Sequence, residues 1–207
     1  MSYKETKQKT QRLVITAFLI ALIVVLQLAA NFFKVGAVSI SLVLIPITVG
    51  SVLLGPAVGA VLGCAFGVVC FLYGLFGLDP FTMSMIAYNP LFTALICLVK
   101  GVAAALACAY VYKLMAKLCR GNVFVSTLIA SLFTPLVNTG LFLLGSVTVF
   151  KGFFEGDGEP IGTIVLLTTL IGSIAVNFIF EIVSNAVLSP TVANFLSKSK
   201  SFKQFCK

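Results

Sequence analysis

Histidine is absent from this sequence, and charged residues make up only 10% of it. The side chain that most often serves as a general base or a metal ligand is therefore missing. The phosphate-binding pattern GxxxxGK followed by Ser or Thr is also absent, so we do not expect the chain to hydrolyse ATP by itself. Neither HExxH nor GxSxG occurs, which excludes the usual metalloprotease and hydrolase arrangements. We expect a protein that is not an enzyme and holds no metal or cofactor.

The cysteines lack the spacing that disulfide frameworks and zinc sites use. The chain has six cysteines, and none of them forms a CxxC pair. Four fall inside apolar stretches, where cysteine acts as a small buried apolar residue: Cys64, Cys70, Cys97 and Cys108. We therefore predict neither a disulfide framework nor a zinc site.

The hydrophobic content is that of a membrane protein. Hydrophobic residues make up 60% of the chain and the mean hydropathy is +1.15, whereas a soluble domain carries about 25% charged residues. A helix needs about 20 apolar residues to cross the bilayer. Six stretches meet or approach this length: 11–31, 39–54, 57–78, 90–117, 123–147 and 163–195. We predict an all-α membrane protein, a compact bundle of six transmembrane helices that forms one integral membrane domain over residues 1–207.

The basic residues occupy alternate gaps between these stretches. They gather in the end segments 1–10 and 197–207 and again at residues 113–120, around the end of the fourth stretch, whereas the acidic residues gather near residues 155–159. Short cytoplasmic segments attract Lys and Arg, so both termini are predicted to be cytoplasmic. The gaps 32–38, 76–89 and 151–162 are then predicted to be loops on the outer side. The net charge of +8 follows from this topology, and we expect no nucleic-acid binding.

Small residues predict where helices approach one another closely. Gly55, Gly59, Gly63 and Gly67 recur every four residues in the third stretch, a spacing that suits close packing inside the bundle. Pro56 suits a first helical turn, and the short link at Gly55 predicts an antiparallel hairpin of the second and third helices. Ala17 and Ala21 form a similar pair in the first stretch, for use within the bundle or by a partner helix.

Polar residues at membrane depth are the candidates for function. Lys100 lies ten residues after Pro90, about 15 Å along its helix, and Glu181 lies well inside the sixth stretch. Such charges are costly in the bilayer and usually functional. Asn177, Glu181 and Asn185 are spaced to share one helix face. Two interpretations stay open: Lys100 and Glu181 pair and lock their helices together, or Lys100, Asn138, Asn177 and Glu181 line a small-molecule pocket between the fourth, fifth and sixth helices.

The whole chain resembles the substrate-binding S components of energy-coupling factor (ECF) transporters, the vitamin importers of bacteria and archaea. The resemblance rests on the Ala17–Ala21 pair, the hairpin stretch 45–60, Asn138-Thr139, and Asn177 with Glu181. It implies a multi-pass protein of the cell membrane that captures its vitamin from outside. It also implies docking on a transmembrane T component, driven by two cytoplasmic ATPase subunits. Ala17 and Ala21 would contact the T component, and Tyr88 and Asn89 would line or gate the ligand pocket.

The resemblance also implies a substrate class. A basic residue followed by glycine, here Lys100-Gly101, together with Asn138-Thr139, is most similar to the pantothenate-type members. Pantothenate is a small acid with hydroxyls and an amide, which suits Lys100 and Asn138. The pantothenate pattern would carry Arg where this chain has Lys, and Lys lacks the planar two-pronged contact. A neutral vitamin such as riboflavin is the alternative if Glu181 neutralises Lys100. A stand-alone channel or secondary carrier is the alternative from a different class.

Overall fold

The computed structural model describes residues 3–30, 34–35, 38–39, 42–156 and 160–199. These residues form seven helices and one antiparallel hairpin of two-residue strands, β1 (Lys34–Val35) and β2 (Val38–Ser39). The helices are α1 (Tyr3–Ala30), α2 (Leu44–Leu54), α3 (Pro56–Leu75), α4 (Pro80–Tyr88), α5 (Pro90–Leu118), α6 (Val123–Gly156) and α7 (Pro160–Lys198). The predicted all-helical fold is confirmed.

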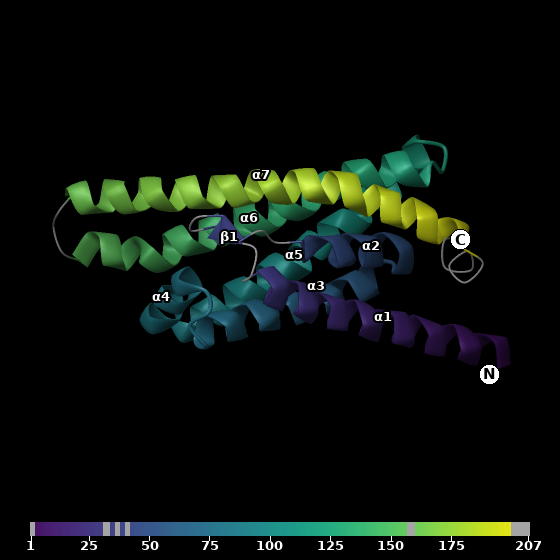
Figure 1. The fold of residues 1–207 in the computed structure, drawn as a ribbon, viewed down its shortest axis with the longest axis horizontal. Coiled ribbons are helices and arrows are strands. Elements are labelled where there is room, and N and C mark those ends of the chain that lie inside the picture. Colours follow the sequence, from purple (N-terminus) through teal and green to yellow (C-terminus); the bar gives the residue numbers. More distant parts are fainter. Residues whose placement is uncertain (1–2, 31–33, 36–37, 40–41, 157–159, 200–207) are drawn as a thin grey trace.

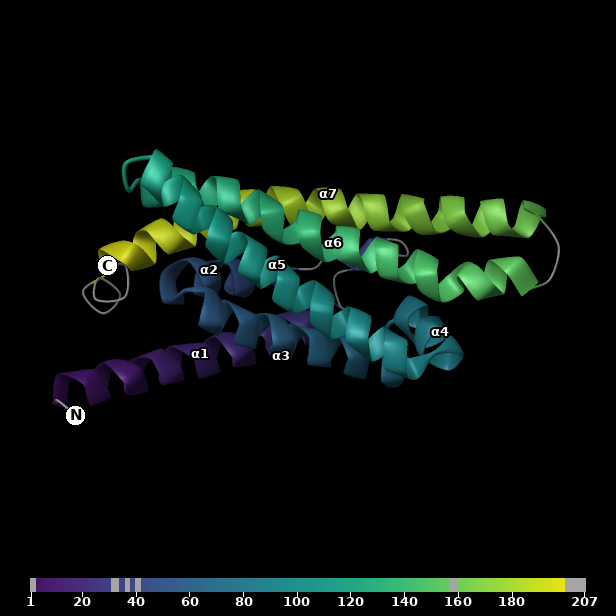
Figure 2. The ribbon, with the colours of Figure 1, turned by 180° about the vertical axis from the view of Figure 1, so that it is seen from behind.

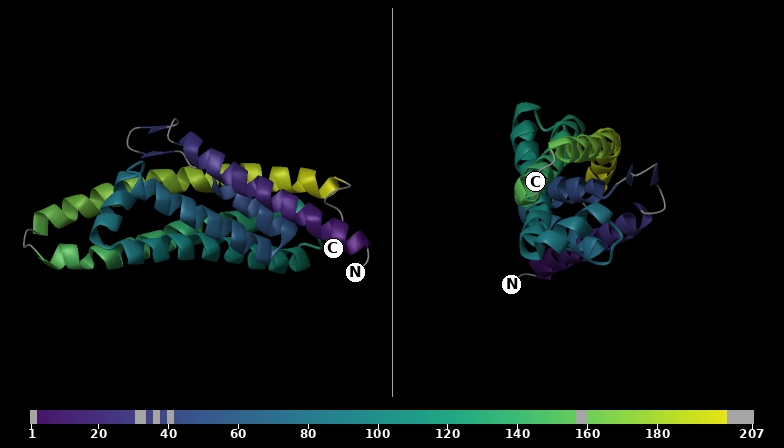
Figure 3. Two further views of the ribbon diagram at one scale, coloured as in Figure 1. Left: turned by 90° about the horizontal axis from the view of Figure 1, so that it is seen from below. Right: turned by 90° about the vertical axis from the view of Figure 1, so that its left-hand side faces the viewer.

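The long helices run side by side in an elongated bundle (Figures 1 and 2). Five of them are long and apolar enough to cross a membrane: α1, α3, α5, α6 and α7. The start of α1 and the end of α7 lie at the same end of the bundle (Figure 3). This arrangement needs an even number of passes, which the short apolar helix α2 completes together with the five long helices. That this end is the cytoplasmic one stays a prediction from the charge pattern.

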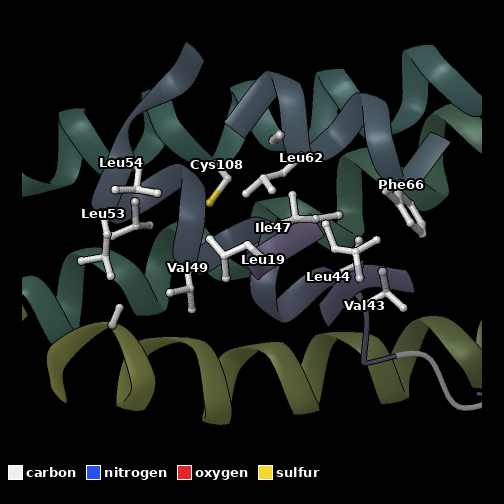
Figure 4. Packing of buried hydrophobic residues seen from close by; sticks show 14 of the residues in the cluster. Leu19, Val43, Leu44, Ile47, Val49, Leu53, Leu54, Leu62, Phe66 and Cys108 are labelled. Carbon is white, nitrogen blue, oxygen red and sulfur yellow. The ribbon is translucent and has the colours of Figure 1, made fainter. Parts of the chain in front are cut away.

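The short helix α2 is the centre of the structure. Its 11 residues extend only about 16 Å, yet ten of them are buried. It contacts α1, α3, α5, α6 and α7. Leu44, Ile47 and Leu53 belong to the main apolar cluster, which Figure 4 shows collected around this helix. Because protein surrounds α2, its terminal backbone groups are not exposed to lipid, where they would lack partners.

A tight turn joins α2 to α3, as predicted. Gly55 has a φ of +91°, a conformation that suits glycine because it has no Cβ. Pro56 occupies the first turn of α3, where its missing N–H costs nothing. Arg12 of α1 donates from Nη2 to the carbonyl oxygen of Leu54 at 2.5 Å. A cation there suits the negative end of the α2 dipole and ties α1 to the hairpin.

Three glycines of the predicted stripe, Gly59, Gly63 and Gly67, pack inside the bundle, whereas nothing lies within 4 Å of the Cβ position of Gly55 in the turn before α3. A Cβ on Gly63 would collide with the backbone of Gly101 and Val102, and a Cβ on Gly67 would collide with the backbone of Cys97 and Leu98. The stripe therefore lets α3 lie directly against α5 (Figure 2). In lipid, such close backbone contact is a principal source of helix association.

Three predicted boundaries were wrong. The second helix begins at Leu44 and not at residue 39. The gap 76–89, predicted to be a loop, contains the helix α4; Asp79 caps its first turn by accepting from the Phe81 N–H at 3.2 Å, with Pro80 next to it. The third outer gap is also shorter than expected, because α6 continues to Gly156 and α7 begins at Pro160. Hydropathy marks apolar stretches and not helix ends: α6 extends beyond its stretch, whereas α2 begins inside its own.

The close contact between Gly63 and the α5 backbone can be tested with a pair of matched variants. Gly63→Ala places a methyl group against the α5 backbone, and overpacking of this kind costs about 1–3 kcal/mol. Gly140→Ala in α6 is the control, because nothing lies within 4 Å of its Cβ position. We expect the Tm of the purified protein in detergent to fall by at least about 2 °C for Gly63→Ala. Gly140→Ala should leave the Tm unchanged or slightly raised. Equal Tm values for the two variants would contradict the close α3–α5 contact.

Candidate functional site

Lys100, on α5, is buried between two aromatic rings that come from other helices. The residue is 7% exposed, and its Nζ lies 4.2 Å from the ring centroid of Phe142 on α6 and 5.7 Å from that of Phe66 on α3. A cation–π contact contributes about 0.5–2 kcal/mol. A charged side chain at membrane depth costs at least about 2.5–3.5 kcal/mol on insertion scales. The rings therefore offset only part of the cost of placing the ammonium here.

Glu181 is buried on α7 with two hydrogen-bond donors. It is 5% exposed. Asn177, one turn earlier on the same helix, donates from Nδ2 to Oε1 at 3.2 Å, and Thr139 of α6 donates from Oγ1 to Oε2 at 3.5 Å. The predicted association of Asn177 with Glu181 is thus present, and Thr139 completes it.

Lys100 and Glu181 both contact α6 but do not form an ion pair with each other. Within the described part of the chain, their charged atoms do not approach within 4.0 Å. The helix α6 packs between α5 and α7. It presents the ring of Phe142 to Lys100 and the hydroxyl of Thr139 to Glu181. Among the described residues, the first of the two open interpretations, a Lys100–Glu181 ion pair that locks the helices together, is therefore not seen.

Two amide oxygens beside these charges have no hydrogen-bond partner. Asn138 is 6% exposed, and its Oδ1 is buried without a partner; the Oδ1 of Asn177 is in the same state. Asn138 lies one turn before Phe142 on α6, so the two side chains share a helix face. A buried polar atom without a partner costs about 1–3 kcal/mol. Together with Glu181, these atoms form a set of acceptors that suits hydroxyl or amide donors of a ligand.

Asn185, which shares the helix face of Asn177 and Glu181, has a different role. Pro135 in α6 lacks an N–H, which leaves the carbonyl oxygen of Ser131, four residues earlier, without its helical donor. Asn185 donates from Nδ2 to that oxygen at 2.8 Å and to Thr48 Oγ1 of α2 at 3.0 Å. Thr48 donates in turn to Thr134 Oγ1 at 3.0 Å. This network links α2, α6 and α7 and has its own partners, so it is structural.

Tyr88 and Asn89 lie at the junction of α4 and α5. Tyr88 is 50% exposed. Asn89 is exposed and caps α5, accepting from the Phe92 N–H at 3.1 Å. Lys100 lies ten residues after the start of α5 at Pro90, about 15 Å along the helix. The structure therefore does not bring these two residues together with the charged cluster, and their role in binding stays a prediction.

Ala17 and Ala21 are both exposed on α1. The buried side of this helix is formed by Leu19 and Ile23 instead. Among the described residues, the alanine pair is therefore not buried by packing within the bundle, and its use by a partner helix stays a prediction.

The sequence did not identify the aromatic residues around Lys100. Phe142 is four residues after Asn138, and Phe66 lies between Gly63 and Gly67 on the face that meets α5. Those spacings were the available signal, but phenylalanine is so common in this chain, with 19 copies, that it did not stand out. Among the described residues, no cluster of three or more Cys, Asp or Glu side chains could hold a metal ion.

Comparison with known proteins identifies one family. The sequence model of the family described as ECF transporter, substrate-specific component, matches residues 11–193. This range includes the alanine pair of α1, all of the charged cluster and the polar network. The family is a substrate-binding part of transporters and not an enzyme family. Comparison with curated protein sequences found no significant match.

The two buried asparagines of α6 and α7 generate opposite predictions for stability. Asn185→Leu removes two hydrogen bonds and leaves a buried carbonyl without a donor, so we expect the Tm to fall by about 2–10 °C. Asn138→Leu removes an acceptor that has no partner, so we expect the Tm to stay constant or rise. Thermal unfolding of the ligand-free protein in detergent measures both. A fall of similar size in both variants would show that Asn138 is a structural residue.

Proposed function

The chain belongs to the family of substrate-specific components of ECF transporters, and we propose that it is the high-affinity subunit that captures a water-soluble vitamin for an ATP-driven importer. The observation that carries this proposal is the cluster of buried polar groups that the protein itself leaves unpaired. It comprises the ammonium of Lys100 and the Oδ1 atoms of Asn138 and Asn177. Burying such groups without a partner lowers the stability of the empty bundle, and a ligand with matching groups supplies the missing partners.

The chemistry of the cluster favours a ligand with an acidic group and several donors. The Lys100 ammonium suits a carboxylate, because it presents three donors and a full positive charge. Asn138, Asn177 and Glu181 present acceptors, which suit hydroxyl and amide N–H groups. Pantothenate carries a carboxylate, two hydroxyls and an amide, and is the substrate that we propose.

Riboflavin is the second candidate, and one observation favours it. Lys100 and Glu181 are both buried against α6, so the cluster as a whole is close to neutral when both are charged. A neutral ligand with many hydroxyls would then suit it. A stand-alone channel or secondary carrier is the alternative from another class, and it would move solute in liposomes that contain this chain alone.

The remaining parts of the proposed machinery are partners. We propose that Ala17 and Ala21 dock on a transmembrane T component and that two ATPase subunits supply the energy. The exposure of both alanines on α1 supports this assignment, because small residues let a partner helix approach closely.

Native mass spectrometry of the protein purified in detergent tests the function directly. We expect a co-purified small molecule with the mass of pantothenate, and isothermal titration with pantothenate and riboflavin should then rank the two. The absence of binding to both vitamins, combined with solute uptake by liposomes that contain only this chain, would reject the proposal.

Lys100→Met tests the ligand role of the buried ammonium. We expect the affinity for pantothenate to fall by more than tenfold, about 1.4 kcal/mol, while the Tm stays constant or rises because no ion pair is lost. Lys113→Met is the matched control, since Lys113 lies on the same helix beside the ring of Tyr110, at 5.9 Å, but is exposed. Unchanged affinity together with a lower Tm would assign Lys100 a structural role.

Ala17→Glu tests the docking face. A charge on this face should block association with the T component, so we expect vitamin uptake by the assembled transporter to be lost while the affinity of the isolated subunit is unchanged. Phe18→Glu is the control, because Phe18 is also exposed but points about 100° away around the helix. Parallel loss of binding and uptake in Ala17→Glu, or equal effects in both variants, would argue against docking at this face.

A further inference from the structure

A row of aromatic side chains connects α4 to the charged cluster. The ring of Phe142 on α6 contacts the Lys100 ammonium on one side. On another side it meets the ring of Phe81 on α4, edge to face, with centroids 5.5 Å apart and planes at 69°. Edge-to-face geometry is the favourable arrangement for two rings. The orientation of the ring that faces Lys100 is thus fixed from α4.

The backbone around Phe142 is held in place as well. Ser146, one turn later on α6, donates from Oγ to the Phe142 carbonyl oxygen at 2.7 Å and lies 3.7 Å from the Sδ atom of Met85. Met85 belongs to α4 and is fully buried, and it forms a small apolar cluster with Ile96 to which Phe81 and Phe142 add. The helix α4 is therefore a fixed support for Phe142, located toward the end of the bundle opposite to the termini (Figure 1).

The contact of Lys100 with an aromatic ring, and not with the carboxylate of Glu181, needs a physical reason. In surroundings of low dielectric constant, an ammonium and a carboxylate attract each other, and Glu181 is hydrogen-bonded to Thr139, three residues before Phe142 on α6. A contact with an aromatic face is weaker than a hydrogen-bonded ion pair. The ammonium nevertheless lies on the ring of Phe142, while Glu181 takes its hydrogen bonds from Thr139 and Asn177. Thr139 and Phe142 are three residues apart on α6, so one helix face holds the two charges in separate places.

We propose that Phe142 is a positioning residue of the binding site, which keeps Lys100 apart from Glu181 so that both charges are available to a ligand. The inference rests on the proposed function in one respect, namely that Lys100 and Glu181 contact the ligand. Phe81 on α4 sets the ring of Phe142 in the orientation that this role requires. The helix α4 thereby acts on the site through the ring of Phe81.

Side-chain NMR of the ligand-free protein, labelled with ¹³C at the lysine Cε, tests the contact. Protons above the face of an aromatic ring resonate upfield, so Lys100 should give one upfield-shifted signal, identified by its loss in Lys100→Arg. We expect the signal to move to the ordinary lysine position in Phe142→Leu, which keeps an apolar side chain but removes the ring. Phe142→Tyr keeps the ring and should keep the shift. An upfield signal that Phe142→Leu does not change would overturn the proposal.

A double-mutant cycle tests the separation of the charges. If Phe142 keeps them apart, an ion pair forms in Phe142→Leu, and adding Glu181→Gln then breaks it. We expect Glu181→Gln to lower the Tm by about 6 °C or more in the Phe142→Leu background beyond its effect in the wild-type protein. Equal effects in the two backgrounds would refute the positioning role. If Phe142→Leu does not fold, Phe142→Met takes its place in both experiments.

These outcomes are independent of the proposed substrate, because both experiments use ligand-free protein. Titration of the labelled protein with pantothenate then connects the two proposals. Movement of the Lys100 signal away from its upfield position is the expected result, since the carboxylate draws the ammonium off the ring. If the signal stays in place under pantothenate but depends on Phe142, the substrate assignment fails and the positioning role stands.

Discussion

The direct contact between α3 and α5 is the constraint on which the site depends. Gly63 and Gly101 leave no room for a Cβ on either helix, so the two backbones meet at this point. Lys100 is the neighbour of Gly101, and Phe66 lies between the two glycines of α3 that touch α5. The depth of Lys100 in the bundle, and the ring behind it, are therefore set by glycine packing. Any side chain at Gly63 would move the helix that carries the ammonium.

The polar groups of the bundle fall into two sets that differ in how they are satisfied. Around Asn185, a proline leaves a carbonyl free, and an amide and two hydroxyls complete the hydrogen bonds. Around Lys100, the opposite charges remain apart and two amide oxygens have no partner. Both sets are buried, so burial alone does not separate structure from function. Lack of a hydrogen bond alone does not separate them either, because Gln27, Ser51, Ser126 and Thr127 also hold a buried oxygen without a partner. What distinguishes the set around Lys100 is that its two unpartnered amide oxygens occur together with two buried, opposite charges.

The sequence predicted the fold better than the site. Long apolar stretches specify membrane helices, and Gly55-Pro56 specified a hairpin, because these signals are local. The helix α4 was missed since nine residues with two caps resemble a loop in a hydropathy pattern. Lys100 and Glu181 stood out because charges are rare at this depth. Whether they pair depends on the helix between them and on Phe142, a residue without any distinctive feature in the sequence. Asn185 was grouped with Glu181 by spacing, and only the freed carbonyl beside Pro135 explains its separate role.

The unpaired state of the cluster has a thermodynamic consequence for binding. A ligand that meets a preformed ion pair must first separate it, and that cost is subtracted from its affinity. A ligand that meets an ammonium on an aromatic face displaces only a weak contact. In the second case, the cost of burying the charges has already been met by the folding of the bundle, chiefly by the apolar packing around α2. A stable core of this kind is what allows a small membrane protein to maintain a binding site that is unfavourable when empty.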